Sequence, residues 1–254
     1  MAKRKKGIGK IISITLLSLI IISLGFYYAR DFHLKLNSKA KYKEFGIYLP
    51  AKYSIHGIDV SRYQNNISWD LVKDMEDKGV KLHFAFMKAT EGINLYDPKF
   101  YNNWKNAKRN GVIRGAYHYF KPSYSGKEQA KIFFKKVDLE PGDLPPVLDV
   151  EETGNVSSKI FIQRIQEWLD DTELKYGIKP IIYTNPSLYN KFFKNIFDDY
   201  PLWVAHYKTN EPGVKREWQF WQHSETGRVD GINANVDFNV FYGDSTAFQN
   251  LLLR

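Results

Sequence analysis

Apolar stretches alternate with amphipathic ones along most of the chain from residue 53 onward. Short apolar, β-branched stretches predict strands at 53–61, 81–90, 114–120, 144–151, 180–184 and 202–207. The stretches between them predict helices at 69–79, 97–110, 125–137, 157–176 and 188–196. The rhythm then changes, because two further strands at 217–224 and 235–241 have only a loop between them.

This order of elements predicts an α/β domain. We expect a TIM-like barrel of eight strands with a reduced set of helices, the last helices being absent. An open, doubly wound sheet is the alternative, but no Gly-rich phosphate turn follows any strand. Local signals mark the helix ends: Ser68 precedes the first helix, Ser125 and Glu128 match a capping box, and Gly177 follows the long helix.

The N-terminal part has a different pattern. An uncharged run rich in Ile and Leu covers 11–28, follows a basic cluster and ends in the aromatic residues 26–28. Its length is near the lower limit for crossing a bilayer. We therefore predict a transmembrane signal-anchor preceding the barrel, with the basic end in the cytoplasm. A cleaved signal peptide, which would make the protein secreted, and a buried core helix are the alternatives.

These patterns divide the chain into three parts. Residues 1–30 form the basic cytoplasmic tail and the membrane segment, 31–52 a polar, lysine-rich stalk, and 53–254 the barrel domain. In either reading of the N-terminal segment as a signal, the barrel lies outside the cytoplasm, facing the periplasm or cell wall.

Charge and cysteine content exclude several kinds of function. The formal net charge is +9, but residues 1–52 carry the whole excess and the predicted barrel is close to neutral. A nucleic-acid-binding domain carries its positive charge on the folded face, so we expect no nucleic-acid partner. The absence of cysteine excludes disulfides, thiol catalysis and thiolate metal sites.

Two carboxylates end the central predicted strand. Asp149 and Glu151 follow an apolar run and share one face, since successive strand side chains point to opposite faces. Catalytic residues of α/β barrels lie at the carboxyl ends of strands, so this pair is a candidate for catalysis or for half of a metal site. A strand running out into an acidic surface loop that includes Glu152 is the alternative.

Asp59 and Asp237 also fall at or near the ends of predicted strands. In a closed barrel they would meet the other two acids at one mouth. Crowded carboxylates in an apolar wall raise one another's pKa, so that one stays protonated as a general acid while another is ionised, as glycoside hydrolysis requires. Each acid alone could equally be a helix cap or an ion-pair partner.

Other kinds of site receive less support from the sequence. The strand histidines have no metal-ligand spacing, so we predict no metal, although carboxylates alone could bind a hard cation. No Gly-x-Ser-x-Gly nucleophile elbow is present. Aromatic residues make up 16% of the chain, which suits a cleft that stacks on sugar rings. The candidates for lining the cleft are Tyr117, Tyr183, Trp203, Tyr207 and Trp221.

Seven short motifs in sequence order make the chain resemble glycoside hydrolase family 25. They lie at 57–61, 88–92, 115–120, 148–151, 202–207, 221–224 and 231–239, so the resemblance covers about 55–242. This is the family of the lysozymes, N-acetylmuramidases that cut the β-1,4 bond from N-acetylmuramic acid to N-acetylglucosamine. Two departures from the family pattern are mild: His206 and His223 stand where other polar residues are expected.

The resemblance implies a fold, a reaction and residue roles. It implies the family's barrel and a retaining mechanism without a cofactor. Glu151 matches the general acid, Asp149 the carboxylate that supports the intermediate, and Asp59 and Asp237 the other two acids of the cleft. The attacking group, a carboxylate or the acetamido group of the substrate, stays open. The N-terminal anchor is not a defining feature of the family.

The sequence thus predicts a membrane-tethered muramidase that acts on the glycan strands of peptidoglycan. Two alternatives stay open at this point. The protein could be a catalytically silent peptidoglycan-binding tether, or it could hydrolyse another N-acetylhexosamine polymer such as chitin.

Overall fold

The structure is a computed structural model that describes residues 20–28, 39–50 and 52–254. The predicted cytoplasmic tail and half of the predicted membrane segment, 11–19, lie outside the described residues. Residues 20–28 are helical with exposed side chains. Within the described ranges, no helix is both long enough and apolar enough to cross a membrane.

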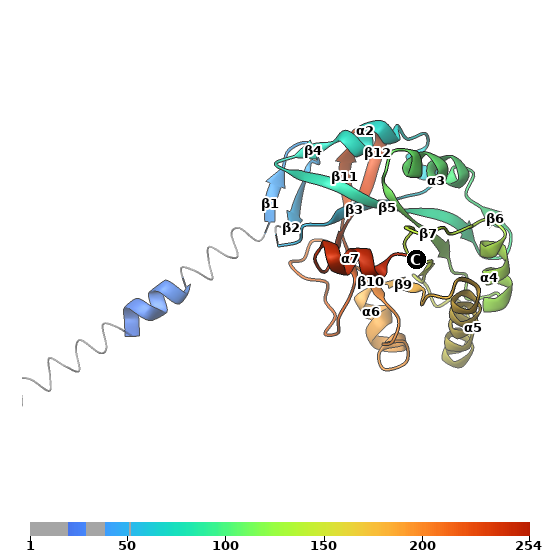
Figure 1. Cartoon of the computed structure of the whole chain (residues 1–254). Coiled ribbons are helices and arrows are strands. Elements are labelled where there is room, and N and C mark those ends of the chain that lie inside the picture. Colours follow the sequence, from blue (N-terminus) through green and yellow to red (C-terminus); the bar gives the residue numbers. More distant parts are fainter. Residues whose placement is uncertain (1–19, 29–38, 51) are drawn as a thin grey trace, which may run out of the picture. The chain divides into compact units, whose positions relative to one another are not determined.

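Eight strands between residues 52 and 254 close into a barrel (Figure 1). They are, in their order around the barrel, β3 (His56–Val60), β12 (Ile232–Phe241), β11 (Phe220–Val229), β10 (Leu202–Ala205), β9 (Ile181–Thr184), β8 (Val147–Asp149), β7 (Ile113–Tyr119) and β5 (Val80–Glu91). Pairing of β3 with β5 closes the ring. Neighbouring strands are parallel except where β12 runs antiparallel to both β11 and β3. The predicted TIM-like barrel of eight strands is confirmed.

The helices are fewer and shorter than in a full TIM barrel. The outer layer contains α2 (Trp69–Asp74), α3 (Phe100–Arg109), α4 (Gly126–Phe134), α5 (Ser158–Tyr176) and the short α6 (Pro186–Leu188), which continues into a π-helical turn (Tyr189–Phe193). Figure 1 shows α3, α4 and α5 covering one side of the barrel. No helix separates β10, β11 and β12, as the sequence predicted. The reduced set of helices is therefore confirmed, although α2 ends five residues before the predicted end.

Long α5 begins and ends at the predicted signals, whereas α4 does not. The Ser157 side chain accepts a hydrogen bond from the Ile160 amide, and Gly177 adopts a left-handed φ of 69°. The predicted capping box at Ser125 is wrong, because its side chain does not cap α4. The Gly126 amide instead donates to Glu167 Oε2 on α5 at 3.1 Å, so a neighbouring helix supplies the cap.

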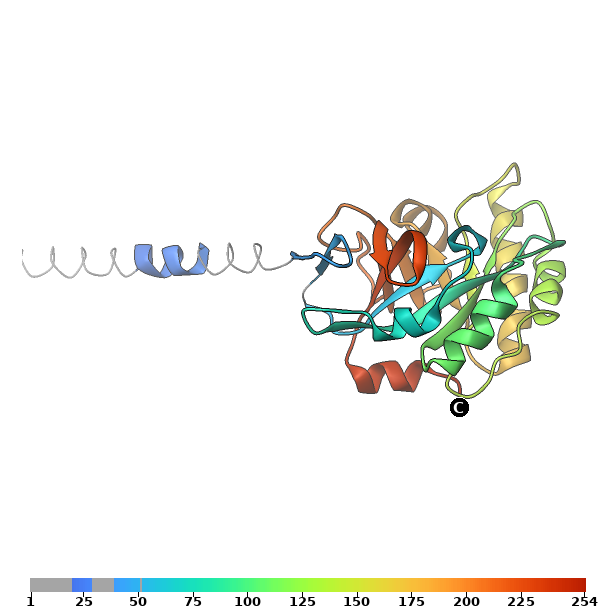
Figure 2. The same cartoon turned by 90° about the horizontal axis from the view of Figure 1, so that it is seen from above.

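The barrel interior is filled by aromatic rings at the end where the parallel strands begin. Phe86 stacks on Trp203 with ring centroids 4.4 Å apart. The final helix, α7 (Ser245–Leu251), brings Phe248 against Phe84 and so closes this end of the barrel (Figure 2). Rings of this size fit because the neighbouring strands carry glycine: a Cβ at Gly115 would lie 2.4 Å from the Phe86 ring.

The predicted stalk at 31–52 differs from the structure where it is described. Two short strands, β1 (Lys39–Tyr42) and β2 (Ile47–Pro50), pair there. The Phe45 ring is fully buried and lies 5.2 Å from the Phe238 ring of β12, while the Arg228 amide donates to the Phe45 carbonyl. The lysines that interrupt the apolar residues of this segment favour a polar stalk, whereas the burial of Phe45 depends on a contact with a distant strand.

Candidate active site

The carboxyl ends of the parallel strands surround one cavity of about 260 Å³. Asp59 lies near the end of β3, Asp149 ends β8, and Glu151 follows two residues later. Asp237 reaches the same cavity from within β12, because that strand is antiparallel and pairs Asp237 with Asp59. The structure thus brings together all four acids that the sequence singled out. Their catalytic roles stay a prediction.

A second, wider hollow of about 630 Å³ adjoins this cavity. The two share Glu151, Tyr183 and Tyr207, and the second is lined further by His206 and the residues at the start of α6. Glu151 therefore stands between two connected depressions. A site of this shape can hold a polymer that continues on both sides of the reacting bond.

Four of the five predicted aromatic residues line the cavity. They are Tyr117, Tyr183, Trp203 and Tyr207. Trp221 does not: it is fully buried, and its Nε1 donates to the His206 carbonyl. Because strand side chains alternate, the neighbouring Gln222 takes the inward face of β11 and Trp221 the outward one.

Asp59 is held by two amide side chains that the sequence reading missed. Its Oδ2 accepts hydrogen bonds from Gln222 Nε2 at 2.6 Å and from Asn239 Nδ2 at 2.8 Å. The Asn239 oxygen accepts from Trp203 Nε1, and the Gln222 oxygen accepts from Tyr183 Oη. Asn239 lies two residues after Asp237 on one strand face, so the alternation of β12 was the signal that could have found it.

Burial and neighbouring negative charges raise the pKa of both Asp59 and Asp237. Burial, followed by the charge of Asp237, raises the pKa of Asp59 well above its ordinary value, against the opposing effect of the two amides. Burial and the charge of Glu225 raise the pKa of Asp237 to about 6. The Asp59 side chain opposes the rise in the pKa of Asp237.

Asp149 and Glu151 differ in their surroundings. Asp149 is 5% exposed, and its Oδ1 has no hydrogen-bond partner in the part of the chain that the structure describes. Burial, and then the charge of Glu151, raise its pKa well above the ordinary value. Glu151 is open to solvent at the mouth of the cavity. Partial desolvation raises the pKa of its carboxyl, and the charge of Lys88 opposes that rise.

Further cavity residues were not named as candidates from the sequence. Lys88 of β5 and Tyr119 of β7 line the cavity together with Glu151, and so do Tyr63 and Gln64 in the 3-10 turn that follows β3. Tyr63 is 69% exposed and stands on a short 3-10 turn (Arg62–Gln64). Ser61 and Gln64 fix that turn by a reciprocal capping box, so an exposed aromatic ring is presented on a rigid support.

The geometry does not favour a metal centre at the described residues. No group of three or more His, Asp or Glu side chains among residues 20–28, 39–50 and 52–254 is arranged to hold a metal ion. His206 and His223, which depart from the family pattern, make contacts unrelated to metal binding. His206 Nδ1 contacts the Glu211 carbonyl at 3.1 Å, and His223 is 7% exposed on the outward-facing part of β11 beside Trp221.

Comparison with known proteins agrees with this geometry. Residues 58–232 match the family described as glycosyl hydrolases family 25. YegX of Escherichia coli K12 is 44% identical over 252 residues, covering 96% of this chain and 93% of YegX. Lysozyme M1 of Streptomyces globisporus is 36% identical over 207 residues, covering 75% of this chain and 69% of that protein.

Solved structures give the same answer. A bacterial lysozyme from Streptomyces coelicolor aligns with a TM-score of 0.71 at 33% identity, over 78% of this chain and 96% of that one. A family 25 glycosyl hydrolase from Bacillus anthracis aligns with a TM-score of 0.71 at 32% identity, over 78% of this chain and 94% of its own. An acid-lined mouth on a barrel of this topology, together with these matches, shows that the chain belongs to glycosyl hydrolase family 25 and is a glycoside hydrolase.

Proposed function

We propose that the protein is a retaining 1,4-β-N-acetylmuramidase that cuts the bond between N-acetylmuramic acid and N-acetylglucosamine in peptidoglycan. The observation that carries this proposal is the contrast between Asp149 and Glu151, two neighbouring carboxyl groups of one cavity with opposite exposure. Glycoside hydrolysis needs such a pair, one carboxyl to move a proton and one to support positive charge. The names of the relatives, lysozyme and muramidase, support the choice of substrate.

Glu151 acts as the general acid and then as the general base. Its carboxyl is open to the cavity mouth and to water, and its raised pKa keeps a proton available closer to neutral pH. It donates that proton to the leaving glycosidic oxygen. It then removes a proton from the water that completes hydrolysis, as a retaining mechanism requires.

Asp149 supports the intermediate. Its buried Oδ1 lacks a partner among the described residues, and a buried acceptor without a partner is costly unless the substrate supplies a donor. The N–H of a 2-acetamido group on the sugar is such a donor. We therefore favour the acetamido oxygen as the group that attacks the anomeric carbon, with Asp149 orienting the amide. The positive charge that develops on the amide favours the ionised form of Asp149, against the raised pKa that burial gives this carboxyl, and the carboxylate then balances that charge.

Asp59 and Asp237 position sugar and water at the opposite wall. Two amides fix the Asp59 carboxyl, and Asp237 lies opposite Asp59 on the neighbouring strand and lines the same cavity. A hydrogen-bonding wall of this rigidity holds hydroxyl groups and the incoming water in place with little loss of entropy at the moment of reaction.

For location, the proposal retains the tether to the membrane and an extracytoplasmic active site. Its support is the sequence of 1–28, a basic cluster followed by a long uncharged run. Fractionation of cells that express the full chain is the test. Recovery in the membrane fraction that resists high-salt washing supports an anchor, and recovery of a shortened chain in the medium supports a cleaved signal.

The experiment that tests the activity is a digest of purified peptidoglycan by the full chain beside its Glu151→Gln variant. Products are reduced and identified by mass spectrometry. We expect reducing-end N-acetylmuramic acid with the unaltered protein and a loss of turnover of at least ~10²-fold in the variant. Intact glycan despite binding would make the protein a silent tether, and reducing-end N-acetylglucosamine would place the cut at the other bond.

The same digest discriminates between substrates and between attacking groups. Chitin in place of peptidoglycan tests the broader N-acetylhexosamine alternative. Peptidoglycan from which the acetyl groups have been removed tests the acetamido proposal, since it lacks the attacking oxygen. Cleavage of the de-acetylated polymer at an unchanged rate would assign the attack to a carboxylate instead.

A further inference from the structure

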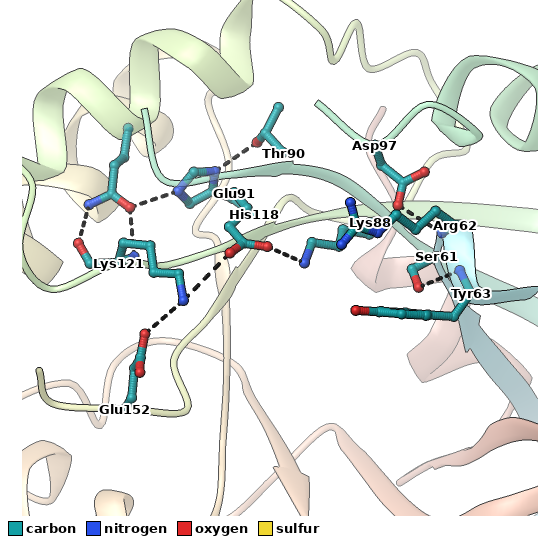
Figure 3. A network of polar contacts seen from close by, with 11 residues as sticks. Ser61, Arg62, Tyr63, Lys88, Thr90, Glu91, Asp97, His118, Lys121 and Glu152 are labelled. Carbon is teal, nitrogen blue, oxygen red and sulfur yellow. Dashed lines mark hydrogen bonds and ion pairs between the residues drawn. The ribbon is translucent and has the colours of Figure 1, made fainter. Parts of the chain in front are cut away.

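Lys88 and Glu91 form an ion pair at the cavity that contains Glu151. Lys88 of β5 lines the cavity, and its Nζ lies 2.6 Å from Glu91 Oε2 (Figure 3). Both side chains are largely shielded, at 14% and 23% exposure, so solvent screens the pair only in part. Glu91 does not line the cavity. Its carboxylate therefore acts on the site through the lysine that it holds.

Tyr119 connects this pair to the general acid. The Lys88 ammonium lies 4.6 Å from the centre of the Tyr119 ring, and the Lys121 ammonium lies at the same distance. Lys121 in turn contacts the second oxygen of Glu91 at 3.5 Å and Glu152 at 2.9 Å. Tyr119 and Glu151 line the same cavity, and the Tyr119 side chain lowers the pKa of Glu151, opposite to the effect of burial. Two cations thus flank the ring of a tyrosine that lines the cavity together with the reacting carboxyl.

The second lysine is fixed through its backbone. Gln129 accepts from the Lys121 amide at 2.8 Å and donates to the Lys121 carbonyl at 3.0 Å. His118 contacts the same Gln129 oxygen and, through its other nitrogen, the hydroxyl of Thr90 (Figure 3). Burial lowers the pKa of His118 to about 4, so this histidine adds no charge to the network at neutral pH.

We propose that Lys88 is a positioning residue for the general acid, held by Glu91 so that one partly neutralised positive charge stands beside Glu151. The inference rests on the proposed role of Glu151 as general acid. It adds the residues that determine the pH range in which the Glu151 carboxyl is protonated. Neither Lys88 nor Glu91 exchanges a proton with the substrate.

The charges around Glu151 show why the pair is needed. Acids face it from three other strands: Asp149 of β8, Asp59 of β3 and Asp237 of β12, with Glu152 adjacent in the chain. The charge of Glu152 favours the protonated Glu151 carboxyl, and the charge of Glu151 in turn raises the pKa of Asp149, Asp59 and Asp237. Lys88 lowers the pKa of Glu151, and Lys121 does so more weakly. Without a cation the acid would hold its proton too firmly to release it, and with an unpaired cation it would lose the proton too early.

The test compares the pH dependence of turnover on peptidoglycan for full-length Lys88→Met and Glu91→Gln. Loss of the cation raises the pKa of Glu151, so the alkaline limb of the Lys88→Met profile moves to higher pH. Loss of the counter-charge lowers that pKa, so the limb of Glu91→Gln moves to lower pH. We therefore expect the turnover of Lys88→Met divided by that of Glu91→Gln to be at least about threefold higher on the alkaline limb than on the acid plateau.

Three controls separate this mechanism from a structural role. Lys81→Met removes a lysine of the same strand from an exposed pair with Glu76, and its profile should match that of the unaltered protein. Lys88→Arg keeps the charge and should restore the position of the limb. The double variant, lacking both partners, should have a limb between those of the single variants.

The outcomes are distinct from those that test Glu151 itself. If Glu151→Gln abolishes turnover but both limbs stay in place, or move in the same direction, the inference about Lys88 is overturned while the general acid stands. If Lys88→Met does not fold, Glu91→Gln decides alone, and an unmoved limb overturns the inference. If Glu151→Gln keeps full activity, the proposed function itself fails.

Discussion

Replacing Gln222 by leucine is the sharpest single test of how the cavity is built. The Gln222 side chain is 2% exposed and joins three polar groups of different strands. Its Nε2 donates to Asp59 at 2.6 Å, and its Oε1 accepts from Tyr183 at 2.7 Å and also from Tyr207. Leucine has nearly the same size and hydrogen-bonds to none of them, so the change removes the contacts without opening a large cavity.

The magnitude follows from which partners lose their only contact. Tyr183 is buried and loses its acceptor, which costs about 1–3 kcal/mol for an unsatisfied buried group. Asp59 keeps the amide of Asn239 and loses one of two donors, a net loss of about 1 kcal/mol. Tyr207 can turn to water in the cavity and contributes little. The free energy of unfolding should therefore fall by roughly 2–4 kcal/mol.

Urea unfolding followed by far-UV circular dichroism measures this loss, and the peptidoglycan digest run in parallel measures turnover. We expect turnover to fall with stability, because the Asp59 carboxyl gains freedom to rotate. Gln163→Leu on α5 is the matched control, since its side chain is exposed and donates to Glu167 on the same helix. A loss below about 1 kcal/mol for Gln222→Leu would refute the reasoning, since it would mean that water replaces these contacts at no cost.

Three further predictions concern stability and binding. Arg114→Met should lower the free energy of unfolding, measured in urea, by about 3–5 kcal/mol. The change leaves the buried Asp143 carboxylate without the guanidinium that donates to it at 2.7 and 3.1 Å. A second change, Asp143→Leu, should restore much of the lost stability. The folded state raises the pKa of Asp237 from 3.8 to about 6, so this group stabilises the fold below pH 4 and its contribution is lost as the pH rises through 6. Asp237→Asn should therefore flatten the dependence of the free energy of unfolding on pH across this range. An unchanged dependence would contradict the assignment. Trp221→Phe should lower stability but leave KM for peptidoglycan within about twofold, since the ring lies outside the cavity; a large rise in KM would return it to the binding site.

The barrel could be predicted from the sequence because each of its parts leaves a local signal. Apolar runs, helix caps and the missing helices between β10 and β12 are properties of neighbouring residues. The convergence of the four acids then follows from closure of the barrel. The position of Asp237 at the mouth, however, depends on the direction of its strand, which the sequence pattern does not give. Its strand runs antiparallel, so its middle, and not its end, lies beside Asp59.

What could not be predicted depends on contacts between distant segments. Whether Trp221 or Gln222 faces inward is decided by the register of β11 on its neighbours. Each face of this strand begins with an aromatic residue and continues with polar ones, so the pattern alone does not choose between them. The cap of α4 comes from Glu167 because Gly126 lets α4 approach α5 closely: a Cβ there would lie 1.9 Å from the Arg164 carbonyl oxygen. The burial of Phe45 likewise requires the far end of the β11–β12 hairpin.

The pairing of the first barrel strand with the last has a consequence for how the protein is made. Asp59 leaves the ribosome early, but the two amides that hold it belong to Gln222 and Asn239, more than 160 positions later. The cleft therefore cannot assemble until almost the whole chain has been synthesised, and closure must wait for these long-range contacts. An unfinished or truncated chain contains acidic residues of the cleft but lacks the contacts that hold them in position. A hydrolase directed at glycan is thus inert throughout its own synthesis, with no separate inhibitor required.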